Sequence, residues 1–376
     1  MRLFDVYPLF DIVPVSAKGC YITDNSGVEY LDLYGGHAVI SVGHSHPEYI
    51  RRISEQLSRI GFYSNSVINP LQEELALKLG ELSDYRDYSL FLCNSGAEAN
   101  ENALKLASFH TGKAGIIAFE KSFHGRTSAA VAVTDNQKII SPLNNTIKRT
   151  ILPLNDVSEL ELSLQSGDVA AVIVEGIQGI GGIRVPEPAF LKKASQLCKK
   201  YGALFILDEV QSGYGRSGKF FAHQYADIQP DIISVAKGMG NGFPIGGILI
   251  NPILKPWFGM LGTTFGGNYL ACAAGIAVLD IIKKEKLIEN SLDVGNYLFS
   301  NLAKIQKITE LRGKGLMIGI EFDFPVDQIR KKLLFEEKIF TGISGANCIR
   351  ILPPLTLTRA QSDHFLEVLV KVLNKL

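Results

Sequence analysis

The stretch SLFLCNSGAEANENALKLASFH, residues 89–110, decides the class of fold. Its first part, Ser89–Cys93, is a short apolar run typical of a buried strand, and an amphipathic helix is predicted from Ala97 to about His110. Between them, Ser95 is followed three residues later by Glu98, a capping box that marks the start of a helix. A strand, a tight turn and a helix in this order predict an α/β protein.

The middle of the chain repeats this alternation. Further strands are predicted at Gly115–Phe119, Ala129–Val133, Val169–Glu175, Leu204–Asp208 and Ile232–Ala236. A helix is predicted at Pro188–Tyr201, where apolar residues recur every three or four positions. Because several of these strands are apolar without alternation, we expect both of their faces to be buried in a mainly parallel sheet.

The two ends of the chain have a different pattern. Residues 18–33 predict a hairpin, and a long helical stretch is expected between Gly267 and about Gln306. Strands at Leu316–Phe322 and Cys348–Leu352 and a final helix from about Thr358 to Leu376 follow. We therefore predict a large domain at 48–265 and a small α+β domain formed by 1–47 together with 266–376.

The composition narrows the classes of partner. The chain has 376 residues, with 38 basic and 38 acidic side chains, so nothing favours a nucleic acid or an anionic membrane over a small molecule. Five cysteines stand far apart without a CxxC pair, which is typical of reduced thiols. The beginning lacks the apolar run of a signal peptide, and no stretch is long and apolar enough to cross a bilayer. We expect a cytoplasmic protein.

Three features of the sequence indicate a site for ligand binding or catalysis. Small Gly96 and Ala97 let backbone N–H groups approach an anion at the start of a helix, although the same residues also fit a plain turn. Asp208 ends a buried strand at the edge of the sheet where ligands bind in open α/β folds. Lys237 ends another apolar strand, and a lysine in an apolar pocket can condense with a carbonyl.

Together, these features meet the requirements of pyridoxal 5'-phosphate. The phosphate of this cofactor needs an anion cradle, its aldehyde needs a lysine, and its ring nitrogen needs an acid that keeps it protonated. Each feature is weak evidence alone, but the set in this order predicts an enzyme that depends on pyridoxal phosphate.

The chain also resembles the class III (ω-) aminotransferases, most of all the acetylornithine and succinylornithine branch. The resemblance runs from Tyr30-Leu31-Asp32 to Ile349-Arg350-Ile351-Leu352-Pro353-Pro354. It implies fold type I of the pyridoxal-phosphate enzymes, a homodimer with shared active sites, and transfer of an ω-amino group to 2-oxoglutarate. The donor implied is an N2-acylornithine, acetylated or succinylated, which yields the acylated glutamate semialdehyde in arginine biosynthesis.

The resemblance also implies the roles of individual residues. Catalysis would rest on Lys237, bound covalently to the cofactor, and on Asp208 at the ring nitrogen. The other cofactor contacts would come from Ser95, Gly96, Ala97, Phe123, Val210, Gln211 and, from the partner subunit, Thr264. The substrates would be bound by Arg126, Thr263, Glu175 and Arg350. Of these, Arg126 and Arg350 would each bind a carboxylate. No metal is implied.

One departure from the family pattern concerns the donor. The family usually has a second glutamate in the motif that starts at Glu175, and this chain has Ile180 there. Because the glutamate in relatives can pair with the arginine at the Arg350 position, we hypothesise that Arg350 is less neutralised here. A pocket of this kind would suit N-succinylornithine better than free ornithine.

Two further motifs permit other interpretations. Gly213–Gly218 matches GxGxxG, but the residues that follow are a poor start for a helix, so a structural loop is favoured over a dinucleotide site. His37, His44 and His46 lack a matching downstream cluster for a metal. An ornithine or 4-aminobutyrate aminotransferase, an aminomutase and a non-catalytic relative that only binds the cofactor stay as alternatives.

Overall fold

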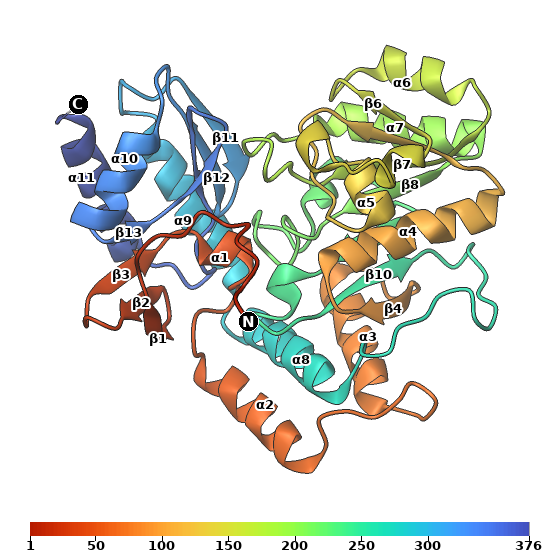
Figure 1. The fold of residues 1–376 in the computed structure, drawn as a ribbon, viewed down its shortest axis with the longest axis horizontal. Coiled ribbons are helices and arrows are strands. Elements are labelled where there is room, and N and C mark those ends of the chain that lie inside the picture. The colour runs from red at the N-terminus through yellow and green to blue at the C-terminus, as the bar shows by residue number, and fades with distance from the viewer. Residues whose placement is uncertain (376) are drawn as a thin grey trace.

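The computed structural model describes residues 1–375 and is built around a seven-stranded sheet (Figure 1). The strands run in the order β4 (Ser89–Cys93), β10 (Gly246–Ile250), β9 (Ile232–Val235), β8 (Leu204–Asp208), β7 (Val169–Glu175), β5 (Gly115–Phe119) and β6 (Arg149–Leu152). Only β10 is antiparallel to its neighbours; the pairs from β9 to β6 are all parallel. The predicted α/β fold with a mainly parallel sheet is confirmed.

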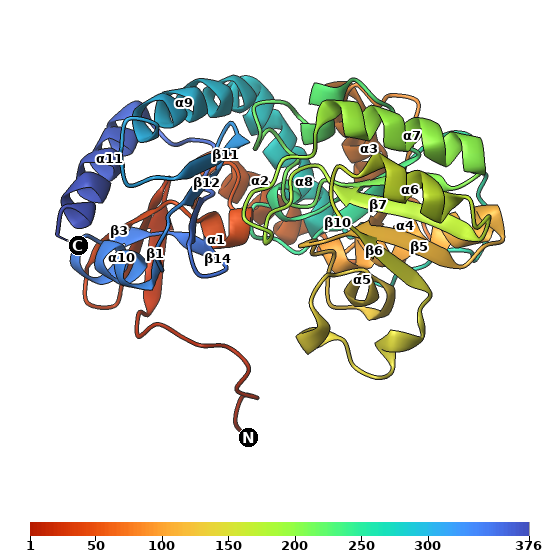
Figure 2. The same cartoon turned by 90° about the horizontal axis from the view of Figure 1, so that it is seen from above.

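Helices cover both faces of this sheet, as seen from above in Figure 2. One face packs on α4 (Gly96–Thr111), and the other on α6 (Val157–Leu164) and α7 (Pro188–Tyr201). Alternate residues of β7 divide between the faces: Ile173 belongs to the core beneath α4, and Val172 to the core beneath α7. This two-sided burial explains why the strand is apolar at nearly every position.

One predicted strand is wrong. Residues 129–133 do not form a strand, because Ser128–Ala132 is the short helix α5. The carboxylate of Glu101, on α4, accepts hydrogen bonds from the backbone N–H groups of Ala129 at 2.9 Å and Ala130 at 3.0 Å. An acid at the positive end of a helix stabilises it, and alanine is the strongest helix former. The deciding contact therefore comes from a distant part of the chain.

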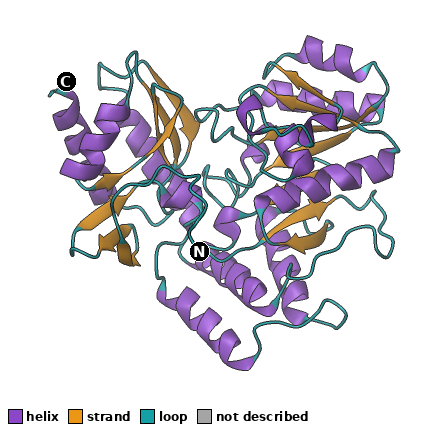
Figure 3. Cartoon of the chain, viewed as in Figure 1, coloured by secondary structure: helices purple, strands orange, loops and turns teal. Residues whose placement is uncertain are grey.

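The two ends of the chain form two small sheets that lie beside each other (Figures 1 and 3). The first contains β1 (Pro14–Lys18), β2 (Tyr21–Asp24), β3 (Glu29–Asp32) and β13 (Ile339–Phe340). The second contains β11 (Glu310–Lys314), β12 (Met317–Glu321), β15 (Cys348–Ile351) and β14 (Gly342–Ser344). A single apolar core joins residues from both ends, including Leu31, Leu33, Ile349 and Phe365.

Two helices replace the long helical stretch expected after Gly267. They are α8 (Tyr269–Lys284) and α9 (Leu287–Leu302), and the chain breaks between them at Lys286, whose φ is +53°. The final helix, α11 (Arg359–Leu373), begins at Thr358 as its N-cap. Leu376, the last residue of the predicted helix, lies outside the described residues.

The remaining helices join these parts. They are α1 (Gly35–Ala38), α2 (Pro47–Arg59), α3 (Pro70–Ser83) and α10 (Asp327–Lys331), with short 3₁₀ or π turns at Gln137–Ile139, Asn144–Thr146, Ala222–Ala226, Lys237–Met239 and Lys332–Glu336. Both α2 and α3 pack on α8. The predicted division at residues 47/48 and 265/266 stays a prediction. Within residues 1–375, no helix has the length and apolar character that a membrane span requires.

Candidate active site

A cavity of about 350 Å³ lies where several strands of the large sheet end. Glu175 and Asp208 are the last residues of β7 and β8, and Lys237 follows β9 by two positions. This is the edge at which open α/β folds bind their ligands. Ten of the residues assigned from the sequence line the cavity: Ser95, Gly96, Ala97, Phe123, Arg126, Glu175, Asp208, Val210, Gln211 and Lys237.

The start of α4 forms an anion cradle. Ser95 caps the helix by accepting a hydrogen bond from the backbone N–H of Glu98 at 3.1 Å. Glu98 in turn accepts one from the backbone N–H of Asn94 at 2.9 Å. At Gly96, a Cβ atom would lie only 2.5 Å from Cγ1 of Val210, so glycine is required for this close approach. Free N–H groups at the positive helix end suit a phosphate.

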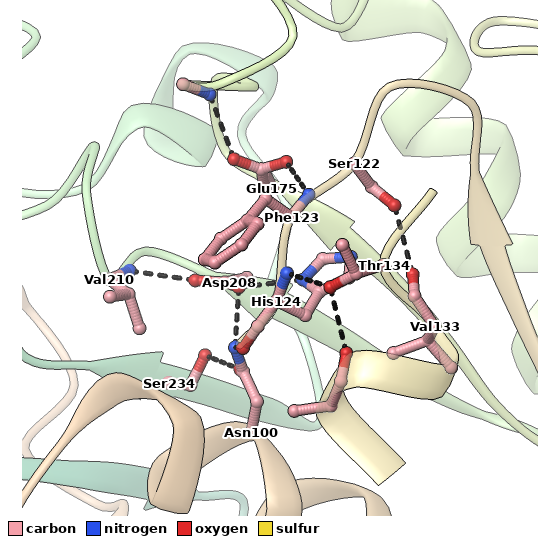
Figure 4. A network of polar contacts seen from close by, with 12 residues as sticks. Asn100, Ser122, Phe123, His124, Val133, Thr134, Glu175, Asp208, Val210 and Ser234 are labelled. Carbon is pink, nitrogen blue, oxygen red and sulfur yellow. Dashed lines mark hydrogen bonds and ion pairs between the residues drawn. The ribbon is translucent and has the colours of Figure 1, made fainter. Parts of the chain in front are cut away.

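Asp208 is the centre of a buried polar network (Figure 4). Its Oδ2 accepts a hydrogen bond from Nδ2 of Asn100 at 2.7 Å and lies 2.7 Å from Nδ1 of His124. Its Oδ1 accepts one from the backbone N–H of Val210 at 3.0 Å. The hydroxyl of Ser234 donates to Oδ1 of Asn100 at 2.5 Å. Three donors therefore hold the Asp208 carboxylate at a fixed position beside the cavity.

Sequence reasoning gave no role to Asn100, His124 or Ser234. His124 stands in the quoted motif next to Phe123, which was a usable signal. Asn100 lies one helical turn after Gly96, so its side chain is on the same face of α4 as the cradle. Nothing local marks Ser234, because its contact with Asn100 joins residues 134 positions apart.

Glu175 binds backbone groups on two sides of the cavity. Its carboxylate oxygens accept hydrogen bonds from the N–H of Phe123 at 3.0 Å and the N–H of Gly179 at 2.9 Å. Burial raises the pKa of Glu175 to about 7, and the nearby charge of Asp208 adds to this shift. In the described structure, Glu175 thus links the loop that carries Phe123 to the turn that follows Gly179.

Lys237 is half-buried at the cavity and has an uncommon backbone conformation, with φ at +45°. Burial lowers the pKa of its ammonium group, and the negative charges of Asp208 and Glu175 only partly oppose this shift. A lowered pKa favours the neutral amine, which is the form that attacks an aldehyde.

The cavity fits a pyridoxal-phosphate ring. Phe123 and Val210 both line it and offer apolar surface to a flat ring. Gln211 donates from Nε2 to the carbonyl oxygen of His37 at 3.1 Å, while its buried Oε1 has no hydrogen-bond partner among residues 1–375. A buried polar atom without a partner is costly, so a bound group that supplies one is favoured.

Three assigned residues lie outside the cavity lining of their own chain. Thr263 accepts a hydrogen bond at Oγ1 from Nδ2 of Asn94 at 3.3 Å, next to the cradle. Thr264 is exposed. Arg350 is buried, and it donates to the carbonyl oxygens of Gly179 at 3.1 Å and Ile343 at 2.9 Å.

The GxGxxG loop and the histidines, for which the sequence favoured no ligand-binding role, contact other residues of the fold. Gly215 and Gly218 pack against Ile288 and Leu292 of α9, so the GxGxxG loop is used in packing. His44 pairs with Asp32 at 2.8 Å, and His46 with Glu285 at 2.9 Å.

Comparison with known proteins identifies the class. The family model of the class III aminotransferases matches residues 5–373, and the chain belongs to this family. Class III aminotransferases depend on pyridoxal phosphate, so the predicted family, enzyme class and cofactor are confirmed. The cavity with Lys237 and Asp208 has the composition that such a cofactor needs.

Individual relatives agree with this assignment. The acetylornithine aminotransferase of Bacillus cereus is 41% identical, over 99% of this chain and 97% of the relative. That of Methanosarcina mazei is 39% identical, over 95% and 91%. Among solved structures, the ornithine aminotransferase of Toxoplasma gondii has a TM-score of 0.93 at 29% identity, covering 99% of this chain and 92% of that one. The acetylornithine aminotransferase of Elizabethkingia anophelis has a TM-score of 0.84 at 32% identity, covering 100% and 96%.

The lowered pKa of Lys237 leads to a prediction for the cofactor-free protein. The rate at which pyridoxal phosphate becomes bound to Lys237 should rise with pH and level off below 10.5, the ordinary pKa of lysine. The sign follows because burial favours the neutral, nucleophilic amine at lower pH. Stopped-flow absorbance measures this rate, with a blocked free lysine run in parallel to correct for titration of the cofactor. A rate that climbs through pH 10.5 as the free lysine does would contradict the prediction.

Proposed function

We propose that this protein transfers the ω-amino group of an N2-acylornithine to 2-oxoglutarate, a step of arginine biosynthesis. The observation that carries the proposal is a cavity that combines half-buried Lys237 and buried Asp208 with an exposed cation, Arg126. The full-length similarity to acetylornithine aminotransferases supports the choice of donor.

In this proposal each residue of the cavity has a separate role in binding the cofactor or in moving a proton. When bound, pyridoxal phosphate supplies an aldehyde for the amine and an electron-withdrawing ring. The cradle at Gly96 and Ala97 would hold the phosphate, and Asp208 would keep the ring nitrogen protonated. Lys237 would hold the cofactor and, once displaced by the donor, would move the proton at the carbon that carries the ω-amine.

Two arginines would orient the substrates. Arg126 is exposed beside the cavity and would bind the α-carboxylate of the donor, which leaves the distal amine to enter toward Lys237. Among residues 1–375, Arg350 donates only to neutral acceptors, which are the carbonyls of Gly179 and Ile343 and, at 3.1 Å, the hydroxyl of Tyr34. Its uncompensated charge supports a role in binding a carboxylate of 2-oxoglutarate.

We also propose a homodimer in the cytoplasm. The loops at 60–69 and 251–268 expose large apolar side chains, among them Ile68, Trp257, Phe258 and Phe265. They contact each other, because Nδ2 of Asn65 donates to the carbonyl of Gly266 at 3.1 Å. Exposed apolar side chains on neighbouring loops are typical of an interface, and exposed Thr264 directly precedes Phe265 in the second loop. The five cysteines are all buried and unpaired, which fits a reducing compartment.

The first experiment compares donors. The purified enzyme is mixed separately with N-acetylornithine, N-succinylornithine, ornithine and 4-aminobutyrate, and the visible absorbance of the bound cofactor is followed. We expect an N-acylornithine to remove this absorbance fastest and 2-oxoglutarate to restore it. A response to ornithine or 4-aminobutyrate alone would replace the proposed donor while keeping the family and the cofactor.

A further inference from the structure

A second cavity, of about 520 Å³, adjoins the first. The two share Phe123 and Ile180, which line both. The second cavity is bounded by the loop at 121–123, by residues 134–136, by the turn at 180–184 and by the loop at 344–348. The two cavities therefore meet at these side chains, and Ile180 lies between them.

The turn that carries Ile180 is firmly held. The backbone N–H of Gln178 donates to the carbonyl of Arg184 at 2.8 Å, and the N–H of Arg184 donates to the carbonyl of Gln178 at 3.2 Å. The hydroxyl of Ser344 donates to the carbonyl of Ile180. The side chain of Ile180 is 44% exposed, so an apolar group without charge separates the two cavities.

The second cavity contains an arginine, Arg184, whose buried Nε has no hydrogen-bond partner among the described residues. Arg312, in the same lining, differs because it pairs with Glu310 and with Glu321. A buried guanidinium N–H without an acceptor is costly, and a carboxylate is the group that satisfies a guanidinium best.

The other charged side chains of the lining do not pair with the guanidinium of Arg184 within the described residues. Asp135 accepts a hydrogen bond from the backbone N–H of Lys121 at 2.6 Å, and Glu321 is occupied by Arg312. Arg312 is paired with Glu310 as well as with Glu321, and Lys121 is exposed. Arg184 is therefore the cation of this lining that a ligand carboxylate can pair with away from solvent.

We propose that the second cavity is a subsite for a carboxylate at the far end of the donor's acyl group, held by Arg184. The inference rests on the proposed function, since it assigns the donor of that same reaction. The loop that bounds the subsite at Phe123 continues to Arg126 three residues later. In this proposal, a donor whose α-carboxylate is bound by Arg126 extends its acyl group past Ile180 into the subsite. The substrate class is an ornithine acylated by a dicarboxylic acid, as in N-succinylornithine.

The test compares kcat/KM for N-succinylornithine and N-acetylornithine. A charge-assisted, bidentate contact is worth about a 10–100-fold preference for the succinylated donor in the native enzyme. In Arg184→Gln this preference should disappear through a loss with the succinylated donor, while the value for the acetylated donor changes by less than about twofold. Lys121→Gln, which removes an exposed charge from the same lining, is the matched control and should leave the preference intact.

A second variant and a binding measurement make the test independent of turnover. Ile180→Glu places a negative charge between the cavities and should weaken the succinylated donor selectively. Calorimetry with N-succinylnorvaline and N-acetylnorvaline, which lack the reacting amine, should show tighter binding of the succinylated compound only while Arg184 is present. Equal losses with both donors in Arg184→Gln, or no preference in the native enzyme, would overturn the inference. Failure of both donors while the cofactor stays bound would instead overturn the proposed function.

Discussion

Lys237→Ala is expected to lower the turnover of acylornithine at least about 10⁴-fold, because it removes both the covalent anchor of the cofactor and the group that moves the proton. Lys237 lines the cavity together with Asp208 and Glu175, and desolvation lowers the pKa of its ammonium group. No other lysine lines the cavity within the described residues, so no neighbouring amine can replace it.

The measurement is steady-state turnover with N-acetylornithine or N-succinylornithine and 2-oxoglutarate. Lys193→Ala, on the exposed face of α7, is the matched control and should retain full activity. Circular dichroism should show that both variants are folded. If Lys237→Ala kept more than about one hundredth of native turnover, Lys237 could not be the principal proton carrier.

Asp208→Asn is expected to lower turnover about 10³-fold with little change of shape. The substitution keeps the size of the side chain but removes the charge that would hold the cofactor's ring nitrogen protonated. It also places an amide next to Nδ2 of Asn100 and Nδ1 of His124, both 2.7 Å from the native Oδ2. A lost charge and a disturbed network therefore act in the same direction.

Two measurements separate a specific effect from unfolding. The visible spectrum of the bound cofactor should change in Asp208→Asn, and the thermal midpoint shows whether the fold persists. Asp227→Asn, at an exposed position with φ of +50° that asparagine tolerates, is the control. Native turnover and an unchanged spectrum in Asp208→Asn would show that Asp208 has no part in the chemistry.

The cradle, Asp208 and Lys237 were predictable because they stand at the ends of strands, whereas the other residues of the lining were assigned only through the family resemblance. The apolar runs of β7 and β8 are long and distinct, and the residue that ends each one, Glu175 or Asp208, is polar. In a parallel sheet these ends meet at one edge, so local patterns suffice to bring such residues together. The same reasoning placed Lys237 after β9 and the cradle after β4.

The parts that were missed depend on contacts between distant residues. The three alanines of Ser128–Ala132 favour a helix, but the contact that caps it comes from Glu101, outside those five residues. The second cavity combines segments near positions 121, 180 and 345, which only the folded chain brings together. The break at Lys286 lies between two helical patterns without proline or glycine, so the sequence around it favours continuity.

The shared core of the two chain ends has a consequence for synthesis on the ribosome. Leu31 and Leu33 are buried against residues such as Ile349 and Phe365, more than 300 positions later. Nearly the whole polypeptide must therefore leave the ribosome before the N-terminal hairpin can bury its apolar side. Pairing over such separations is slow, and the growing chain exposes these residues throughout that time. The strands of the N-terminal hairpin are synthesised first, but they are among the last elements to pack into the folded core.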